Sequence, residues 1–320
     1  NIKIFILLIK LIEQGFLIFI TVIFSITNIK NKEHKMKKIF LLIFLIENLV
    51  FAKIPQRAVS ISHFTTEILL LIGAENQMVG TAYLDTPILP ELKDRFEKIP
   101  ILSDKFPTKE LFYSVRPDFV TGWEGLVKSR NLGPKKELEE NGVQVYIFKS
   151  LNDERIEVLY SDILELGKIF KLEKNARELV EKIKKELSEI EKKVPKQKKK
   201  VLVCDPGDDQ PFVLGGKGIG NYIIELAGAK NVTAEINKAW GYSTWEKIIV
   251  SNPEYILIPD YEGRDYEEKV KYLKNESPIK DLKAIKENKI IKIDLAGISP
   301  GVRISTEAKK IAEKLHGIKF

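Results

Sequence analysis

The residues best suited to holding a ligand are aromatic side chains that stand outside the apolar helical stripes. Trp123, Trp240 and Tyr242 follow strands or stand in open loops of the sequence pattern. Aromatic rings supply a large contact area with few rotatable bonds, which suits a large organic ligand. Packing in a hydrophobic core is the alternative for each of them. Trp245, by contrast, lies within an expected helix and is interpreted as a packing or interface residue.

Three polar residues also stand at positions that suit a binding site. His63 ends the first expected strand and precedes a helix, so it is expected to line the mouth of a cleft. Tyr83 follows the expected strand 78–82 and could stack on a ligand. Arg303 stands in a loop before the last helix. Its guanidinium could pair with an anionic ligand group or form a salt bridge to the other half of the chain.

The composition argues against several other chemistries. One cysteine and three histidines are too few for a disulfide framework, a cysteine-based metal site or a cage for a bare metal ion. No Ser-His-Asp set has supporting spacing, and Cys204 has no evident activating histidine. The glycine-rich segment 215–220 lacks the Lys-Ser/Thr pair of a phosphate-binding loop, so it is interpreted as a turn whose backbone approaches a ligand. We therefore expect no catalysis, no metal site and no cofactor.

The basic charge does not indicate nucleic-acid binding. The chain carries a formal net charge of +7. Residues 1–52 contribute seven lysines against three glutamates, a net of +4, which leaves +3 for residues 53–320. No basic stripe with interleaved aromatic residues is present. We therefore expect no nucleic-acid partner.

The elements that must position these residues come in two similar halves. Segments 108–120 and 244–256 share Thr, Glu, Pro, an acid, an aromatic and a β-branched residue at the same offsets. Upstream, Gly-Ala-x-Asn occurs at 73–76 and again at 228–231, each time after an apolar helical stretch. Two matched motifs in the same order indicate a duplicated unit.

Each half alternates short apolar strands with helices. This pattern predicts an α/β fold of two lobes with mostly parallel sheets, covered on both faces. The expected strands are 58–61, 78–82, 119–122 and 145–148 in the first half, and 200–204, 212–214, 255–258 and 290–293 in the second. The expected helices are 65–72, 109–115, 134–141, 220–227, 245–251, 279–287 and 305–315.

A single long helix is expected between the halves. Over 175–194 the apolar residues recur at three- and four-residue intervals with Lys and Glu between them, as in an amphipathic helix. At about 1.5 Å per residue it would span roughly 30 Å and would act as a strut that restricts hinge bending. The predicted organisation is an N-terminal lobe at 53–172, a connecting helix at 173–195 and a C-terminal lobe at 196–320.

The first 52 residues are interpreted as a targeting region. Met36-Lys37-Lys38, the apolar run 39–46 and the small residues up to Ala52 form the pattern of a secretory signal peptide over 36–52. Residues 1–35 are interpreted as sequence upstream of a start at Met36, with a membrane anchor as the alternative. Cleavage would leave Lys53 first. Because Lys53 is not cysteine, we expect no lipid attachment and a free periplasmic protein, not a lipoprotein.

Together these features resemble the class III substrate-binding proteins of ABC importers, which deliver cobalamin, ferric siderophores and haem. The resemblance covers roughly residues 56–318 and is carried by 57–67, 79–80, 109–120, 228–232 and 240–253. It implies two α/β lobes joined by one helix, a ligand held in the cleft and little closure on binding. The implied partner is an ABC importer permease in the inner membrane, and the protein is expected to be a monomer.

The resemblance also implies roles for particular residues. In the family, one exposed glutamate per lobe pairs with arginines of the permease. The matching positions are Glu110 and Glu246, which the internal repeat places in register. Both also stand in first turns of expected helices, where a carboxylate is favoured without any docking role. The cobalamin-binding member has tryptophans at the positions of Trp123 and Trp240 and a cleft tyrosine at that of Tyr83, a residue type that ligates iron in some haem proteins.

These observations predict a periplasmic binding protein, not an enzyme, that captures an iron complex of siderophore type and delivers it to an importer. A corrinoid or haem is the alternative ligand in the same cleft. Alternatives from other classes are a bilobal α/β enzyme or metal-cluster protein, and a membrane-tethered interaction protein that uses residues 1–27 as its anchor. The candidate ligand-binding residues are His63, Tyr83, Trp123, Trp240, Tyr242 and Arg303, and the candidate docking residues are Glu110 and Glu246.

Overall fold

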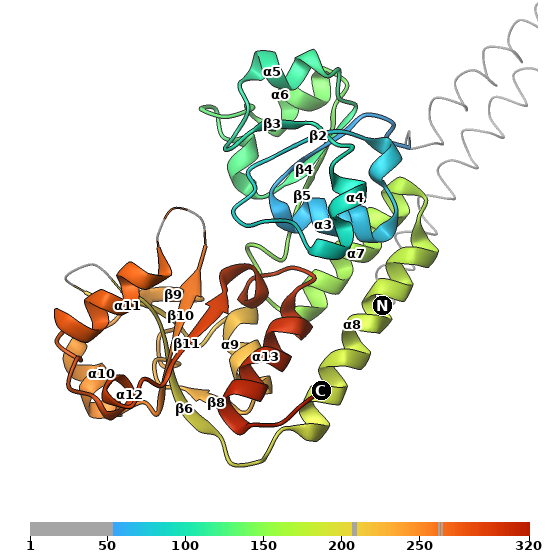
Figure 1. The fold of residues 1–320 in the computed structure, drawn as a ribbon. Coiled ribbons are helices and arrows are strands. Elements are labelled where there is room, and N and C mark those ends of the chain that lie inside the picture. The colour runs from blue at the N-terminus through green and yellow to red at the C-terminus, as the bar shows by residue number, and fades with distance from the viewer. Residues whose placement is uncertain (1–53, 207–209, 262, 264) are drawn as a thin grey trace, which may run out of the picture. The chain divides into compact units, whose positions relative to one another are not determined.

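The computed structural model describes residues 54–206, 210–261, 263 and 265–320. Residues 55–320 form one compact unit with two α/β lobes joined by a long helix (Figure 1). The two-lobed α/β fold expected from the sequence is therefore confirmed. The expected signal peptide at 36–52 and the segment 1–35 lie outside the described residues.

The N-terminal lobe is built on a five-stranded parallel sheet with the order β3-β2-β1-β4-β5. All four residues of β1 are buried, as expected for a central strand of a parallel sheet that is covered on both faces. The strands are β1 (Ala58–Ile61), β2 (Met78–Ala82), β3 (Ile101–Ser103), β4 (Phe119–Gly122) and β5 (Gln144–Ile147). The helices are α3 (His63–Ile72), α4 (Lys93–Phe96), α5 (Lys109–Ser114), α6 (Lys135–Glu140) and α7 (Ile156–Phe170), with short 3-10 helices at Glu75–Gln77, Pro90–Leu92 and Glu124–Val127.

The C-terminal lobe contains a six-stranded sheet with the order β11-β10-β6-β7-β9, and β8 pairs with β6. β6, β8, β10 and β11 run parallel, whereas β7 and β9 are antiparallel additions. The strands are β6 (Lys199–Asp205), β7 (Phe212–Leu214), β8 (Ala229–Asn231), β9 (Trp240–Tyr242), β10 (Tyr255–Asp260) and β11 (Ile290–Asp294). The helices are α9 (Ile219–Leu226), α10 (Trp245–Ser251), α11 (Tyr266–Asn275), α12 (Lys283–Lys286) and α13 (Ile304–His316), with a 3-10 helix at Leu295–Ile298.

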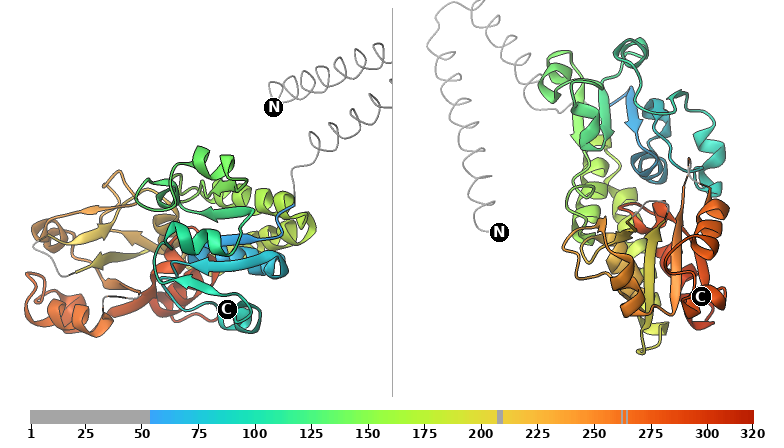
Figure 2. Two further views of the ribbon diagram at one scale, coloured as in Figure 1. Left: turned by 90° about the horizontal axis from the view of Figure 1, so that it is seen from above. Right: turned by 90° about the vertical axis from the view of Figure 1, so that its left-hand side faces the viewer.

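Helix α8 (Glu173–Lys193) connects the lobes and runs along one side of the unit (Figures 1 and 2). Its buried residues form a stripe that belongs to a hydrophobic core reaching from α3 and α7 to α9 and α13. Asn175 at one end donates a hydrogen bond of 2.7 Å to the Ile72 carbonyl, which ends α3. Toward the other end, Glu186 accepts a hydrogen bond from Ser305 of α13. The expected amphipathic helix is thus tied to both lobes.

The internal repeat is visible as two equivalent structural units. Thr108 and Thr244 are the N-caps of α5 and α10, and each hydroxyl accepts a hydrogen bond from the backbone N–H three residues later. Asp118 accepts hydrogen bonds from the two backbone N–H groups that precede β1. Glu254, its counterpart in the second half, accepts one from the backbone N–H of Lys200 in β6. The repeated Thr and acid therefore perform the same structural tasks in both lobes.

The structure differs from the sequence-based expectation in several elements. The strands β3, β8 and β9 and the helices α7 and α11 are additional, so Trp240 and Tyr242 lie in an edge strand rather than an open loop. The helix expected over 279–287 shrinks to α12. The Lys280 and Leu282 N–H groups bond to the carbonyls of Ser277 and Ile279, three residues earlier, so this stretch forms turns instead of an α-helix.

Candidate functional site

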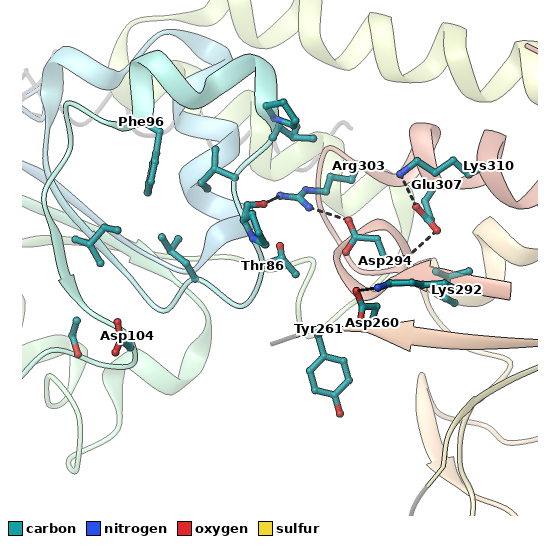
Figure 3. Close-up of a pocket in the computed structure, with 18 residues that line it drawn as sticks. Thr86, Phe96, Asp104, Asp260, Tyr261, Lys292, Asp294, Arg303, Glu307 and Lys310 are labelled. Atoms are coloured by element: carbon teal, nitrogen blue, oxygen red, sulfur yellow. Dashed lines mark hydrogen bonds and ion pairs between the residues drawn. The ribbon is translucent and has the colours of Figure 1, made fainter. Parts of the chain in front are cut away.

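A cavity of about 1030 Å³ lies between the two lobes (Figure 3). The N-terminal lobe contributes the segment that follows β2, from Leu84 to Pro90, together with Phe96 of α4 and the end of β3. The C-terminal lobe contributes the ends of β10 and β11 and the beginning of α13. Ligand pockets in proteins have volumes of about 300–1,000 Å³. The cavity is therefore large enough for a bulky organic ligand.

The carboxyl ends of parallel strands from both sheets meet at this cavity. Asp104 follows β3 in the N-terminal lobe, and Asp260 and Asp294 end β10 and β11 in the C-terminal lobe. All three line the cavity. In open α/β sheets, ligands bind outside the carboxyl ends of the strands. The topology therefore places the cavity where such a fold holds a ligand.

An aromatic cluster follows the strands of the N-terminal lobe. The centre of the Tyr83 ring lies 5.0 Å from the centre of the Phe106 ring and 5.6 Å from that of the Trp123 ring. The Phe106 and Trp123 rings are stacked, with 5.6 Å between their centres. Tyr83 has a φ of 59°, a left-handed conformation uncommon for a tyrosine, and it directly precedes the cavity residue Leu84. The structure thus brings two of the candidate residues together, and Phe106 completes the cluster.

A second aromatic cluster belongs to the C-terminal lobe. The Phe212 and Trp240 rings are stacked at 5.6 Å with an interplanar angle of 17°, and the Tyr242 ring lies 5.1 Å from Phe212. Phe212 pairs with Asp205 at the carboxyl end of β6, and Tyr242 pairs with Phe212. Phe212 and Tyr242 therefore lie at the carboxyl end of the C-terminal sheet, but neither they nor Trp240 line the cavity, and Tyr242 is 61% exposed.

His63 lies inside the N-terminal lobe, is only 2% exposed and does not line the cavity, contrary to the expectation that it stands at the mouth of a cleft. Its Nδ1 atom lies 3.7 Å from a carboxylate oxygen of Asp85, and its ring packs against that of Phe64. Neither ring nitrogen has a hydrogen-bond partner among the described residues. Asp85 also pairs with Lys105, whose ammonium group lies 4.7 Å from the centre of the Tyr83 ring. His63 is thus connected to the aromatic cluster through Asp85 and Lys105.

Arg303 lines the cavity and joins the two lobes. It forms bidentate hydrogen bonds with Glu67 of α3, a carboxylate that is buried in the N-terminal lobe. It also donates to Asp294 at 2.9 Å and to the Pro87 carbonyl at 2.6 Å. Of the two roles that the sequence allows, the structure contains the salt bridge between the lobes.

Tyr261 is held in the cavity wall by a buried ion pair that sequence reasoning did not find. Its hydroxyl donates to Asp205 at 2.7 Å. The Lys269 ammonium lies 3.0 Å from the same carboxylate, donates to the Pro259 carbonyl at 2.8 Å and stands 4.1 Å from the Tyr261 ring centre. Lys269 is 4% exposed, so this network fixes Tyr261 from within the lobe.

Glu110 and Glu246 are fully exposed, one in the first turn of α5 and one in that of α10. Hydrogen bonds from its own backbone N–H and from the capping threonine hold the pKa of each carboxyl below its usual range. Each is therefore an ionised carboxylate at neutral pH. Exposed apolar side chains accompany them, Leu111 on α5 and Ile249 and Val250 on α10.

The glycine-rich segment 215–220 has a packing explanation. A Cβ atom at Gly215 would lie 2.1 Å from the Lys238 carbonyl oxygen, and one at Gly216 would lie 1.9 Å from that of Ala234. Gly218 has a φ of +94°, and a Cβ atom there would lie 2.3 Å from a carboxylate oxygen of Glu154. These close approaches account for the glycines without any ligand.

The described residues offer little for covalent or metal chemistry. Burial raises the pKa of the Cys204 thiol well above its usual range, which disfavours the thiolate that a nucleophile requires. Across the ranges given above, no group of three or more His, Cys, Asp and Glu side chains is arranged to hold a metal ion. No helix in the described part of the chain is long and apolar enough to cross a membrane.

Curated relatives of this protein match most of the chain. It is 25% identical over 276 residues to the ABC transporter substrate-binding lipoprotein YvrC of Bacillus subtilis, covering 84% of this chain and 83% of that protein. It is 25% identical to the haem uptake protein IsdE of Staphylococcus aureus (73% and 81% covered). It is 21% identical to the vitamin B12-binding protein of Yersinia pseudotuberculosis (65% and 70% covered).

The relative YvrC overturns one expectation. The name of that relative describes it as a lipoprotein, which contradicts the expectation that this protein is not a lipoprotein. The argument from Lys53 excluded attachment only at the residue after one presumed cleavage site. It therefore says nothing about an anchor elsewhere.

Solved structures and a family description agree with the fold. A periplasmic binding protein from Veillonella parvula is 35% identical, with a TM-score of 0.78 over 84% of this chain and 94% of that chain. A possible iron-binding periplasmic solute-binding protein from Staphylococcus epidermidis is 25% identical, with a TM-score of 0.69 over 82% and 100%. Residues 59–295 match the family described as periplasmic binding protein. The chain therefore belongs to the periplasmic binding protein family and is similar to the substrate-binding proteins of ABC importers.

Proposed function

We propose that this protein binds an iron complex of siderophore type between its lobes and delivers it to the permease of an ABC importer. The observation that carries the proposal is the cavity of about 1030 Å³ at the carboxyl ends of both sheets. An aromatic cluster stands near the same sheet edge in each lobe. Such rings suit the organic shell of a chelate because they bury a large area with few rotors. In this proposal the protein binds and delivers the complex without a catalytic step.

The proposed ligand contacts come from both lobes. Tyr83 and Trp123 would contribute from the N-terminal lobe, and Trp240 and Tyr242 from the C-terminal lobe. His63 would act indirectly, since its side chain is buried and its Nδ1 atom lies 3.7 Å from a carboxylate oxygen of Asp85. Arg303 would form part of the cavity wall while joining the two lobes.

The proposed docking residues are Glu110 and Glu246. Their support is threefold, because they occupy equivalent positions of the repeat, are ionised, and lie on helices at the outer parts of different lobes (Figure 1). A carboxylate pairs with arginine through directional, charge-assisted hydrogen bonds. The exposed Leu111 and Val250 beside them would add apolar contact area.

A corrinoid or haem is the second candidate ligand. It is favoured by the relatives whose names include vitamin B12 and haem. Tyr83 would be the candidate iron ligand for haem, since a phenolate can serve as an axial ligand. The absorption spectrum of the protein purified from its native host distinguishes the candidates, because ferric chelates, haem and corrinoids have different visible bands.

Quenching of tryptophan fluorescence tests the proposal directly. Trp123 and Trp240 belong to the two proposed aromatic clusters, so a bound ferric chelate should quench the emission saturably with one site per protein. The same chelator without iron, and a ferric salt without chelator, are the controls. Saturable quenching by a corrinoid or haem but by no ferric chelate would reject the iron chelate in favour of the second candidate.

A further inference from the structure

The cavity walls carry a nearly balanced set of charges. Among the described lining residues three are basic (Lys292, Arg303 and Lys310) and four are acidic (Asp104, Asp260, Asp294 and Glu307). The electrostatic attraction or repulsion between the cavity wall and a ligand depends on which of these charges are already neutralised by a neighbouring side chain. Figure 3 shows that the basic side chains point at carboxylates of their own lobe.

The two lysines of the cavity are paired within the C-terminal lobe. The Lys292 ammonium lies 2.7 Å from a carboxylate oxygen of Asp260, on the adjacent strand. Lys310 lies 3.5 Å from Glu307, one turn earlier in α13. Glu307 is also fixed by the backbone N–H of Asp294 at 3.0 Å. Each ammonium group is thus already opposed by a carboxylate, and it attracts a ligand anion less strongly than an unpaired cation would.

Arg303 has more partners than either lysine. Its guanidinium bonds to Glu67, to Asp294 and to the Pro87 carbonyl, so its donors face protein acceptors from both lobes. Glu67 is 1% exposed. Removing the guanidinium from this carboxylate would leave a buried charge without its partner, which is costly. An anionic ligand would therefore have to compete with a buried ion pair.

The N-terminal side of the cavity adds negative charge. Lys105, beside the Tyr83 ring, lies 3.7 Å from Asp85. Asp104 is exposed in the cavity wall and forms no ion pair with another described residue. The cavity thus presents paired cations and one carboxylate that has no counter-charge.

We infer that this cavity selects its ligand by charge, accepting neutral or cationic complexes and rejecting polyanionic ones. The inference rests on the proposed function, since it takes the cavity between the lobes as the ligand site. A neutral complex leaves every ion pair intact and packs against the apolar part of the lining, such as Leu84, Ile88 and Phe96. A polyanionic complex must approach the unpaired Asp104 carboxylate and cations whose charge is already offset by carboxylates, so repulsion provides the discrimination.

The test compares four probes that differ in charge and in chemical family. Ferrichrome is a neutral ferric hydroxamate and ferric enterobactin a trianionic ferric catecholate; cyanocobalamin is a neutral corrinoid and haemin carries two propionates. Tryptophan quenching gives an affinity for each. Ferrichrome is compared with ferric enterobactin, and cyanocobalamin with haemin. In whichever comparison shows binding, we expect the neutral probe to bind at least about tenfold more tightly than the anionic one. The difference should shrink as ionic strength rises from about 0.05 to about 0.5 M.

One pair of variants isolates the charge effect. Asp260→Asn removes the carboxylate partner of Lys292 and should raise the affinity for the anionic probes several-fold relative to the affinity for the neutral ones. Asp281→Asn is the matched control, because Asp281 pairs with Lys286 at 3.0 Å on the surface and does not line the cavity. Equal effects of the two variants would overturn the inference.

The outcomes separate the inference from the proposed function. Tighter binding of ferric enterobactin than of ferrichrome would overturn charge selection and leave the iron-chelate function standing. Tight binding of cyanocobalamin alone would support charge selection and reject the iron chelate. Saturable binding of none of the four probes would overturn both.

Discussion

At the scale of single residues, Trp240 provides the clearest test of a ligand contact. It is half-buried and stacked on Phe212, so one face of the ring packs against protein. We predict that Trp240→Ala weakens ligand binding by about 1–3 kcal/mol, the range for an aromatic anchor at an interface. Trp245→Phe is the control, since Trp245 is 7% exposed within α10 and packs near Tyr272. Unchanged affinity in Trp240→Ala, measured by calorimetry, would assign the ring to packing alone.

Glu154 is predicted to make stability depend on pH. Its carboxylate accepts the Ile219 N–H at the N-terminus of α9, and burial raises the pKa of Glu154 to about 7 from an ordinary value of 4.5. The folded state therefore keeps the proton of the Glu154 carboxyl to a higher pH than the unfolded state does. The contribution of this protonated carboxyl to the free energy of unfolding is complete below about pH 4.5 and is lost as pH rises through 7.

Glu154→Gln removes this dependence and keeps an acceptor for the Ile219 N–H. The variant should be more stable than the parent by about 1–3 kcal/mol at pH 8, less where solvent reaches the carboxyl, and equal at pH 4. Chemical denaturation at several pH values measures the difference. Glu157→Gln, at an exposed position three residues later, controls for loss of one charge. A parallel pH dependence of variant and parent would contradict the assignment.

The sequence indicates the candidate aromatic residues by type but not the rings against which they pack. Tyr83, Trp123, Trp240 and Tyr242 stand out because they follow strands or interrupt apolar patterns. Phe106 follows the missed strand β3, so its place beside Tyr83 could not be inferred. Similarly, the stacking of Phe212 on Trp240 depends on the register between β7 and β9, which a short strand does not reveal.

At the scale of elements, Arg303 connects α13 to α3. We predict that Arg303→Met lowers the free energy of unfolding by about 3–5 kcal/mol, since Glu67 would remain as a buried charge. The double variant Glu67→Gln with Arg303→Met should recover part of that loss. Denaturant titration of the single and double variants gives the coupling energy. A weaker ligand affinity without loss of stability would instead make Arg303 a ligand residue.

Regular patterns predicted many of the elements, and strands such as β1 and β4 and the long helix α8 follow directly from apolar periodicity. The helices α7 (Ile156–Phe170) and α11 (Tyr266–Asn275) were overlooked although their apolar residues recur at helical spacing. The strands that were missed have a different explanation. The strands β3, β8 and β9 contain three residues each, too few for a period to be recognised. They are strands because neighbouring strands supply their hydrogen-bond partners, which is information from the tertiary fold.

At the scale of the whole molecule, the proposed docking on the permease involves both lobes. We predict that the double variant Glu110→Ala with Glu246→Ala impairs uptake by cells while leaving ligand affinity unchanged, because both carboxylates are exposed and do not line the cavity. Glu157→Ala with Glu267→Ala is the matched control, since both are exposed first-turn glutamates on other helices, α7 and α11. Equal losses of affinity and uptake would contradict a docking role.

The position of bound iron tests the central claim most directly. A crystal of the full chain with ferrichrome, measured at the iron absorption edge, gives the iron site from anomalous scattering. We predict one peak between the lobes, at the carboxyl ends of the strands and near the two aromatic clusters. A peak on the outer surface of either lobe, or none with the protein saturated in solution, would contradict the assignment of this cavity as the binding site.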